Sequence, residues 1–180
     1  MAISVTPASS TDAAALASLA AATFPLACPP TAAAEDIAAF IAANLSAQRF
    51  SDYLTDTDRI VFCANDCASA EDRIIGYTML VRGIGSDPDI ARSVPHRPAV
   101  ELSKMYVLPS HHRSGAATAL MRAGIDWAAA GGGAAVWLGV NKNNSRAQRF
   151  YRKHGFEVVG SRAFRLGDQD EDDFVMVRPL

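Results

Sequence analysis

The chain has 180 residues, of which 49% are hydrophobic and 20% charged, and its formal net charge is −2 at pH 7. A chain of this length and composition can close one hydrophobic core, which predicts a single domain over residues 1–180 and excludes disordered, collagen-like and small disulfide-stapled proteins. The small negative charge excludes broad electrostatic capture of nucleic acid or of an anionic membrane and leaves only a local basic patch open.

The cysteines Cys28, Cys63 and Cys67 form an odd set whose spacing fits no disulfide framework. Cys63 and Cys67 have only Asn65 and Asp66 nearby as poor additional ligands, so we expect no metal site. The first ten residues lack a basic segment followed by an apolar core, and no apolar run reaches the roughly twenty residues that span a bilayer. These features predict a cytoplasmic protein that is not inserted in a membrane.

The N-terminal part of the chain predicts a strand followed by two helices. Ile3 and Val5 alternate with polar neighbours and indicate the strand, after which a helix runs to about Phe24. Thr31 is expected to cap a second helix that continues to Leu45.

Two β-branched segments and a long loop come next. Residues 59–63 and 73–81 are separated by a polar stretch, which is typical of a hairpin. The loop 83–98 has no periodic pattern, and loops of this length are often functional, so we interpret it as a candidate lid.

From residue 100 onward, strand-like and helix-like patterns alternate. The expected elements are a strand over 100–107, a helix over 114–130, a strand over 135–140, a helix over 145–154, and a hairpin of strands 156–166 and 173–178 around the turn 167–172. The glycine run 131–133 precedes a strand, so it is expected to end a helix rather than to bind a dinucleotide. In chain order the sequence predicts strand, two helices, three strands, helix, strand, helix and two strands, which is an α/β fold on a mixed sheet.

One strand-to-helix turn carries the clearest chemistry. Pro109 ends the strand, and Gly115 with the small Ala116 and Ala117 lets a ligand approach the backbone of the first helical turn. The free N–H groups and the positive dipole end of such a helix bind anions, and Arg113 adds a full charge, so a pyrophosphate would fit there. An ordinary turn with small residues for tight packing explains the same spacing.

Two segments resemble motifs of the GCN5-related N-acetyltransferase (GNAT) superfamily. The first resembles its strand-turn-helix motif through Val107, Pro109, His112, Gly115 and Ala117. His112 stands where the family usually has Gln or Arg, which departs from the pattern at a side chain but leaves the backbone cradle intact. The second is similar to a later family segment through Asn144, Ala147, Phe150, Tyr151, Gly155 and Phe156. The resemblance is strong over residues 100–156 and implies the GNAT fold and acetyl-CoA as cofactor.

A narrower resemblance is to the bacterial PaiA-type polyamine acetyltransferases. It is found in the segments 137–140, 155–160 and 164–176, and the dipeptides Thr23–Phe24 and Gly76–Tyr77 agree with it. This likeness implies a polyamine such as spermidine or spermine as the acceptor.

The GNAT resemblance also implies which residues contact the cofactor. A backbone N–H near Tyr106 to Leu108 would polarise the acyl carbonyl, where splaying from the strand 135–140 leaves backbone groups unpaired. Asn144 would orient the pantetheine arm and Lys153 could reach a CoA phosphate, although a helix cap and a solvated lysine explain these two residues as well. The expected cofactor-binding residues are Met105, Tyr106, Val107, His112, Arg113, Ser114, Gly115, Ala116, Ala117, Thr118, Asn144, Tyr151 and Lys153.

Acyl transfer to an amine needs a base for the amine and an acid for the leaving thiolate. The resemblance implies that Tyr151 is the acid, whereas burial statistics alone would have it pack on the sheet like Phe150. Glu101 is the candidate base, and the same carboxylate would serve as a contact for a cationic substrate. His111 and His112 are alternative bases that are more readily interpreted as neighbours of the phosphate.

The acceptor pocket falls in segments without motifs. Residues 168–173 are strongly acidic and would attract a polycation, and a solvated hairpin tip explains them as well. We expect acetyl transfer to a primary amine of a small molecule, with a polyamine favoured by the narrower resemblance. The alternatives are an amino-acid, peptide or antibiotic amine as acceptor, or an acyl-CoA-binding module without turnover, and a homodimer is left open.

Overall fold

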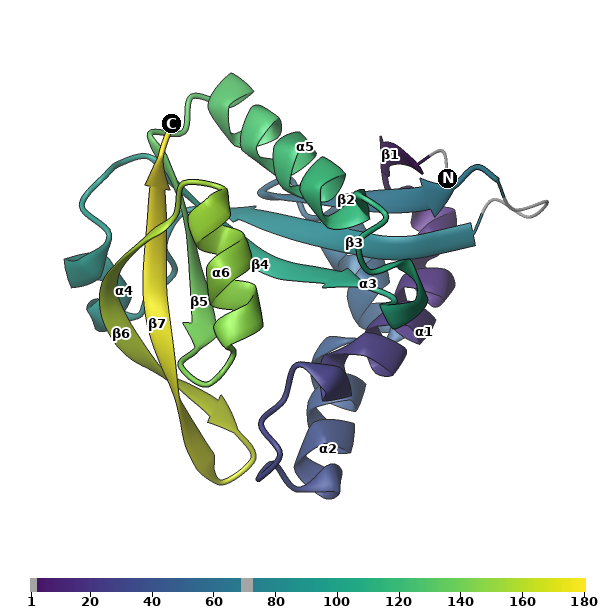
Figure 1. The fold of residues 1–180 in the computed structure, drawn as a ribbon, viewed down its shortest axis with the longest axis horizontal. Helices are drawn as coiled ribbons and strands as arrows, with labels where there is room; N and C mark the ends of the chain where they lie inside the picture. The colour runs from purple at the N-terminus through teal and green to yellow at the C-terminus, as the bar shows by residue number, and fades with distance from the viewer. Residues whose placement is uncertain (1–2, 69–72) are drawn as a thin grey trace.

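The computed structural model describes residues 3–68 and 73–180, which fold around one mixed β-sheet (Figure 1). Its seven strands lie in the order β1-β2-β3-β4-β5-β7-β6, and β4 and β5 form the parallel pair among antiparallel neighbours. The strands are β1 (Ile3–Pro7), β2 (Arg59–Asp66), β3 (Arg73–Arg82), β4 (Ala99–Val107), β5 (Ala135–Asn141), β6 (Glu157–Leu166) and β7 (Gln169–Pro179). The predicted α/β class and the chain order of the strands are confirmed.

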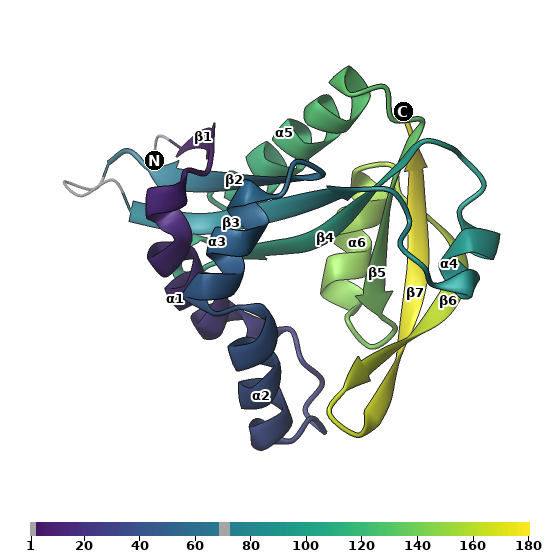
Figure 2. The ribbon, with the colours of Figure 1, turned by 180° about the vertical axis from the view of Figure 1, so that it is seen from behind.

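Helices cover both faces of the sheet (Figures 1 and 2). They are α1 (Ala13–Thr23), α2 (Ala34–Asn44), α3 (Ala47–Thr55), α4 (Pro88–Ser93), α5 (Ala116–Ala130) and α6 (Ser145–Lys153). We call the face covered by α5 and α6 the α5–α6 face, and the opposite one, which α1, α3 and α4 cover, the α1–α3 face. Within the described segments, no helix is long and apolar enough to cross a membrane.

Each face of the sheet has its own buried core. On the α5–α6 face, α5 buries Leu120 and Met121 against the sheet. On the α1–α3 face, Phe50 of α3 lies edge-on to Tyr77 of β3, with ring centroids 5.5 Å apart, and Leu16 of α1 belongs to the same cluster. The face on which a strand residue lies therefore decides which of two environments its side chain meets.

The helix α5 follows its prediction closely. Its buried residues recur every three or four positions, as expected for a helix on a sheet. Gly124 allows the close approach, because a Cβ atom there would lie 2.8 Å from the Leu80 side chain. Gly131 caps the C-terminus of the helix and Gly132 has a φ of +77°, so the prediction of a helix stop is confirmed.

Two helices are additional to the predicted order, and the first of them is α3. Its Ser46 cap accepts a hydrogen bond from the Arg49 N–H at 3.3 Å, and it buries Phe50 and Tyr53. The preceding helix α2 begins at Ala34 without a side-chain cap, so the predicted cap by Thr31 is wrong.

The second additional helix is α4, and it makes the predicted lid wrong. The Asp87 side chain accepts a hydrogen bond from the Asp89 N–H at 2.8 Å and starts this short helix. Ile90 and Val94 are fully buried in a cluster with Trp137 of β5. Because the segment contributes two side chains to the core, it is a packed part of the fold and not a lid over a site.

The last turn is also shorter than predicted. β6 and β7 are joined by Gly167, with a φ of +59°, and Asp168, so most of the acidic residues lie in β7. Each acidic side chain has a neighbouring partner: Asp168 and Asp170 pair with Arg165, Asp172 with Lys142, Asp173 with Arg162, and Glu171 with Asn141. These partners offset much of the local negative field that the sequence suggested.

Candidate active site

A bulge in β4 decides which of its side chains share a face. The register with β3 shifts between Leu102 and Lys104, so Ser103 is an extra residue. Leu102 packs on the α5–α6 face, whereas Tyr106 packs on the α1–α3 face, although strict alternation would give both the same face. The bulge therefore brings Lys104 onto the face that also holds Glu101.

Beyond Glu101, β4 and β5 diverge, as Figure 1 shows. Their pairing covers 99–101 of β4 and 135–137 of β5, after which β4 stays with β3 and β5 with β7. Met105, Tyr106 and Val107 lie on the β4 edge of this opening. The predicted splaying is confirmed, and it leaves β4 backbone groups without a strand partner on that side, as an extended ligand requires.

The turn after β4 has a special backbone conformation. Arg113 and Gly115 have φ angles of +71° and +93°, and Gly115 is the N-cap residue of α5. The Ser114 hydroxyl accepts a hydrogen bond from the Ala116 N–H at 3.2 Å. A Cβ atom at Gly115 would meet nothing within 4 Å, so the space beside it is open.

The first turn of α5 offers free donors toward this space. Within residues 3–68 and 73–180, the N–H groups of Gly115, Ala117 and Thr118 have no backbone acceptor. Free amides, the positive end of a fifteen-residue helix and an adjacent arginine together suit a pyrophosphate. The turn therefore fits the diphosphate of CoA.

Both histidines of the turn contact the protein itself. His112 Nε2 lies 3.2 Å from the carbonyl oxygen of Val107, and His111 Nε2 lies 3.5 Å from a carboxylate oxygen of Asp66. Each ring thus links the turn to the end of a strand, β4 for His112 and β2 for His111.

Three of the predicted residues lie on or next to α6. The Asn144 side chain accepts a hydrogen bond from the Ala147 N–H at 3.0 Å, so it caps the helix while its amide group keeps two donors. Lys153 is exposed at the end of the helix. Tyr151 packs against the sheet, with its ring 5.9 Å from that of Phe156.

The Tyr151 side chain is partly buried against the core of the α5–α6 face. Burial raises its pKa to about 12, so the hydroxyl keeps its proton at neutral pH. Tyr151 in turn helps to raise the pKa of Tyr106, although burial is the larger cause there. Tyr106 of β4 packs on the α1–α3 face, whereas Tyr151 of α6 packs on the α5–α6 face.

Glu101 occupies the last paired position before the opening, on the α1–α3 face. Burial raises the pKa of its carboxyl, and the positive charges of Arg162, Lys104 and Arg59 act in the opposite direction. Lys104 and Arg162 were not among the predicted site residues. In the sequence, the larger aliphatic residues of this strand fall on even positions up to Leu102 and on odd positions from Met105. This change of pattern was the feature that could have indicated the bulge, and with it the face on which Lys104 lies.

The comparisons with known proteins agree with this geometry. The sequence pattern described as the acetyltransferase (GNAT) family matches residues 20–156. An uncharacterised N-acetyltransferase of Mycobacterium tuberculosis strain H37Rv is 52% identical over 170 residues, covering 94% of this chain and 99% of the relative. An uncharacterised N-acetyltransferase of Mycobacterium bovis has the same identity and coverage. The chain belongs to the GNAT acetyltransferase family.

Solved structures share the GNAT fold of this chain over its whole length. The PaiA N-acetyltransferase of Thermoplasma acidophilum, solved with coenzyme A, has a TM-score of 0.77 at 21% identity, with 100% of each chain covered. NAA60 of Arabidopsis thaliana, solved with acetyl-CoA, has a TM-score of 0.77 at 16% identity, with 99% of each chain covered. The predicted family and fold are thereby confirmed.

As a GNAT member the chain is an N-acetyltransferase, and acetyl-CoA is its cosubstrate. When bound, acetyl-CoA supplies an acetyl thioester for attack by an amine. The residues that fit it are the amides after Arg113 for the diphosphate and the open edge of β4 for the extended arm.

Proposed function

We propose that the chain transfers the acetyl group of acetyl-CoA to a primary amine of a small molecule, with Glu101 and Tyr151 in the proton transfers. The observation that carries the proposal is the opening between β4 and β5, which has Glu101 at its closed end and Tyr151 on α6, the helix that follows β5. Glu101 takes a proton from the acceptor ammonium, and the Tyr151 hydroxyl donates one to the leaving sulfur. Unpaired N–H groups of β4 polarise the acyl oxygen.

For the acceptor, two classes of amine are candidates, and the first is a polyamine such as spermidine or spermine. Glu101 supplies a carboxylate at the closed end of the opening, and the resemblance of the segments 137–140, 155–160 and 164–176 to PaiA-type polyamine acetyltransferases supports the same class. A second candidate is an amine that carries a carboxylate. The cations Lys104 and Arg162, which flank Glu101, favour it.

Release of CoA thiol with a panel of amines tests the proposed function. Spermidine, spermine, amino acids, a short peptide and an aminoglycoside are each offered with acetyl-CoA, and we expect amine-dependent thiol release with at least one small amine. Thiol release that no amine accelerates, from protein that binds CoA, would instead indicate a binding module without turnover.

Replacing Glu101 by Gln should lower kcat/KM roughly tenfold at neutral pH, since a positioned base is lost. In the unchanged enzyme kcat/KM should rise with pH as Glu101 ionises, and burial places this rise above the ordinary glutamate range. In the variant, kcat/KM should no longer rise with the ionisation of Glu101 and should rise only where the acceptor amine loses its proton. Glu157→Gln, at an exposed position on β6, is the matched control. An unaltered pH profile in Glu101→Gln would remove Glu101 as the base.

The proposal further includes one acetyltransferase domain over residues 1–180, a cytoplasmic location and no nucleic acid as partner, and it leaves a homodimer open. The free thiols of all three cysteines support the location. Light scattering of the purified protein measures the number of copies.

A further inference from the structure

The acceptor side of the sheet carries two partly buried cations, and the first is Lys104. Its Nζ lies 5.6 Å from the centre of the Tyr53 ring, on the α1–α3 face. Among residues 3–68 and 73–180, no carboxylate oxygen lies within 4 Å of this ammonium. Burial lowers the pKa of Lys104 to about 8, with Glu101 acting against that effect.

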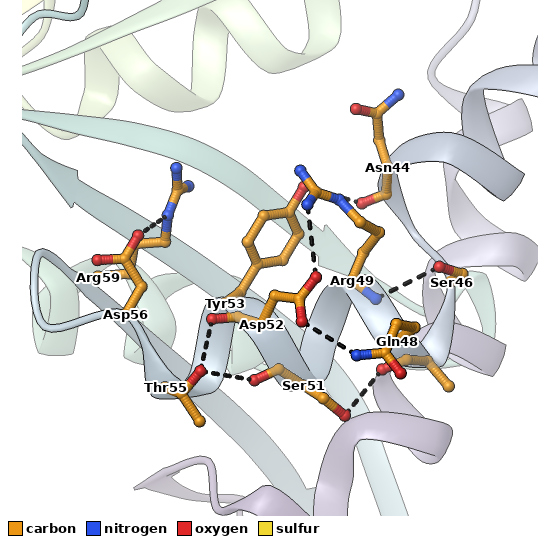
Figure 3. Close-up of polar contacts among 11 residues, drawn as sticks. Asn44, Ser46, Gln48, Arg49, Ser51, Asp52, Tyr53, Thr55, Asp56 and Arg59 are labelled. Carbon is orange, nitrogen blue, oxygen red and sulfur yellow. Dashed lines mark hydrogen bonds and ion pairs between the residues drawn. The ribbon is translucent and has the colours of Figure 1, made fainter.

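The neighbours of Lys104 add positive charge. Arg59 and Arg49 lie over the same Tyr53 ring, with their guanidinium carbons 5.0 and 5.1 Å from its centre. Figure 3 shows that these two arginines have partners of their own, Asp56 at 2.7 Å and Asp52 at 3.5 Å. Lys104 is therefore the member of this group whose charge has no close counterion.

The second cation approaches from the other side of the opening. Arg162 lies opposite Asp173 in the pairing of β6 and β7, and its guanidinium lies 5.5 Å from the Trp137 ring. Gly139 makes room for it, because a Cβ atom there would overlap the Arg162 guanidinium. The Arg162 Nε is buried without a hydrogen-bond acceptor among the described residues, and the Asp173 carboxylate is 3.8 Å away.

These contacts give the acceptor side a mixed charge. Glu101 supplies one carboxylate, and Lys104 and Arg162, whose charges both act on Glu101, supply two cations with spare donors. A polycation would use Glu101 and leave Lys104 without a close counterion, while Arg162 would keep Asp173 at 3.8 Å as its partner. An amine that also carries an acid group would use all three, because its ammonium meets Glu101 while its carboxylate meets a lysine and an arginine.

We propose that the acceptor is a small amine that also carries a carboxylate, such as an amino acid, and that Lys104 and Arg162 bind this carboxylate. The proposal rests on the proposed acetyl transfer to a small primary amine and specifies its substrate class. Lys104 and Arg162 are specificity-determining residues in it, and Glu101 keeps its role toward the amine.

Matched pairs of acceptors that differ by the carboxylate test this proposal. Phenylalanine and lysine are compared with phenethylamine and cadaverine, their decarboxylated counterparts, and with spermidine, by kcat/KM for thiol release. We expect each acid to exceed its decarboxylated counterpart at least tenfold. Lys104→Met and Arg162→Gln should each lower this ratio at least tenfold, mainly through KM of the acid, and Lys104→Arg should restore part of it.

Arg49→Gln is the control, because Arg49 lies at the same Tyr53 ring but is exposed and paired with Asp52. It should leave the ratio as in the unchanged enzyme, and calorimetry with CoA verifies that each variant is folded. If the unchanged enzyme had a higher kcat/KM with the decarboxylated amines or with spermidine than with the acids, the proposal would be overturned. This outcome needs no variant, so it holds even if a variant fails to fold. A ratio insensitive to both Lys104 and Arg162 would overturn it too. Thiol release that no amine accelerates would defeat the proposed acetyl transfer, and this proposal with it.

Discussion

Replacing Tyr151 by Phe should lower turnover by roughly a hundredfold or more while the affinity for acetyl-CoA stays the same. The substitution keeps the ring that packs on Phe156 and removes one hydroxyl. A phenol with a pKa of about 12 donates to a thiolate, whose usual pKa is about 8.5, only when the buried site disfavours the thiolate as well. The hydroxyl should therefore matter for kcat and little for binding.

The pH profile gives a second measure of the same role. Because burial raises the pKa of Tyr151 to about 12, the phenol stays protonated through pH 10, and kcat of the unchanged enzyme should not fall on the alkaline side up to that pH. Stopped-flow measurement of thiol release gives kcat, and calorimetry gives the CoA affinity. Tyr53→Phe is the control, since it removes a hydroxyl that donates to the Asn44 carbonyl. Full activity of Tyr151→Phe would mean that water protonates the sulfur.

Replacing Gly115 by Asp should weaken CoA binding at least a hundredfold. Gly115 has a φ of +93°, where an L-residue is strained, and its N–H belongs to the amide cradle at the start of α5. A carboxylate there would fill the open space beside the glycine and repel the diphosphate. Calorimetric titration with CoA measures the loss.

Gly132→Asp is a closely matched control for the strain. Gly132 also has a positive φ, +77°, and open space around its Cβ position, but it lies at the opposite end of α5. It should lower the melting temperature to a similar extent and leave CoA affinity unaltered. Equal losses of affinity in the two variants would attribute the effect to strain, and unaltered affinity in Gly115→Asp would place the diphosphate elsewhere.

The elements that the sequence predicted well are those with a long, regular pattern. α5 has five buried positions on one stripe, and its glycine stop follows directly, so its end at Ala130 could be predicted. α3 was missed because it has nine residues, is mostly polar and buries only Phe50 and Tyr53. α4 was missed because only Ile90 and Val94 mark it, among aspartates and prolines typical of loops.

The candidate site also has one part that the sequence predicted and one part that it did not. The diphosphate turn could be predicted because its chemistry is local, residing in consecutive residues from Arg113 to Thr118. Lys104 and Arg162 are 58 positions apart in the chain. Both act on Glu101 only because the bulge turns one β4 side chain over and because β6 pairs with β7, which itself pairs with β5. Neither event has a motif, so the acceptor side required the three-dimensional arrangement.

The divergence of β4 and β5 also divides the sheet into two plates, β1–β4 and β5–β7, which share one short pairing. Three residue pairs, from Ala99–Ala135 to Glu101–Trp137, join the two strands, while α5 lies mainly over the β1–β4 plate. Glu101 and the diphosphate turn belong to one plate, and Tyr151 and Arg162 are attached to the other. The angle between the plates therefore sets the distance between Glu101 and Tyr151, the two groups that we propose for the proton transfers, and the small residues Ala99 and Ala135 lie at the joint.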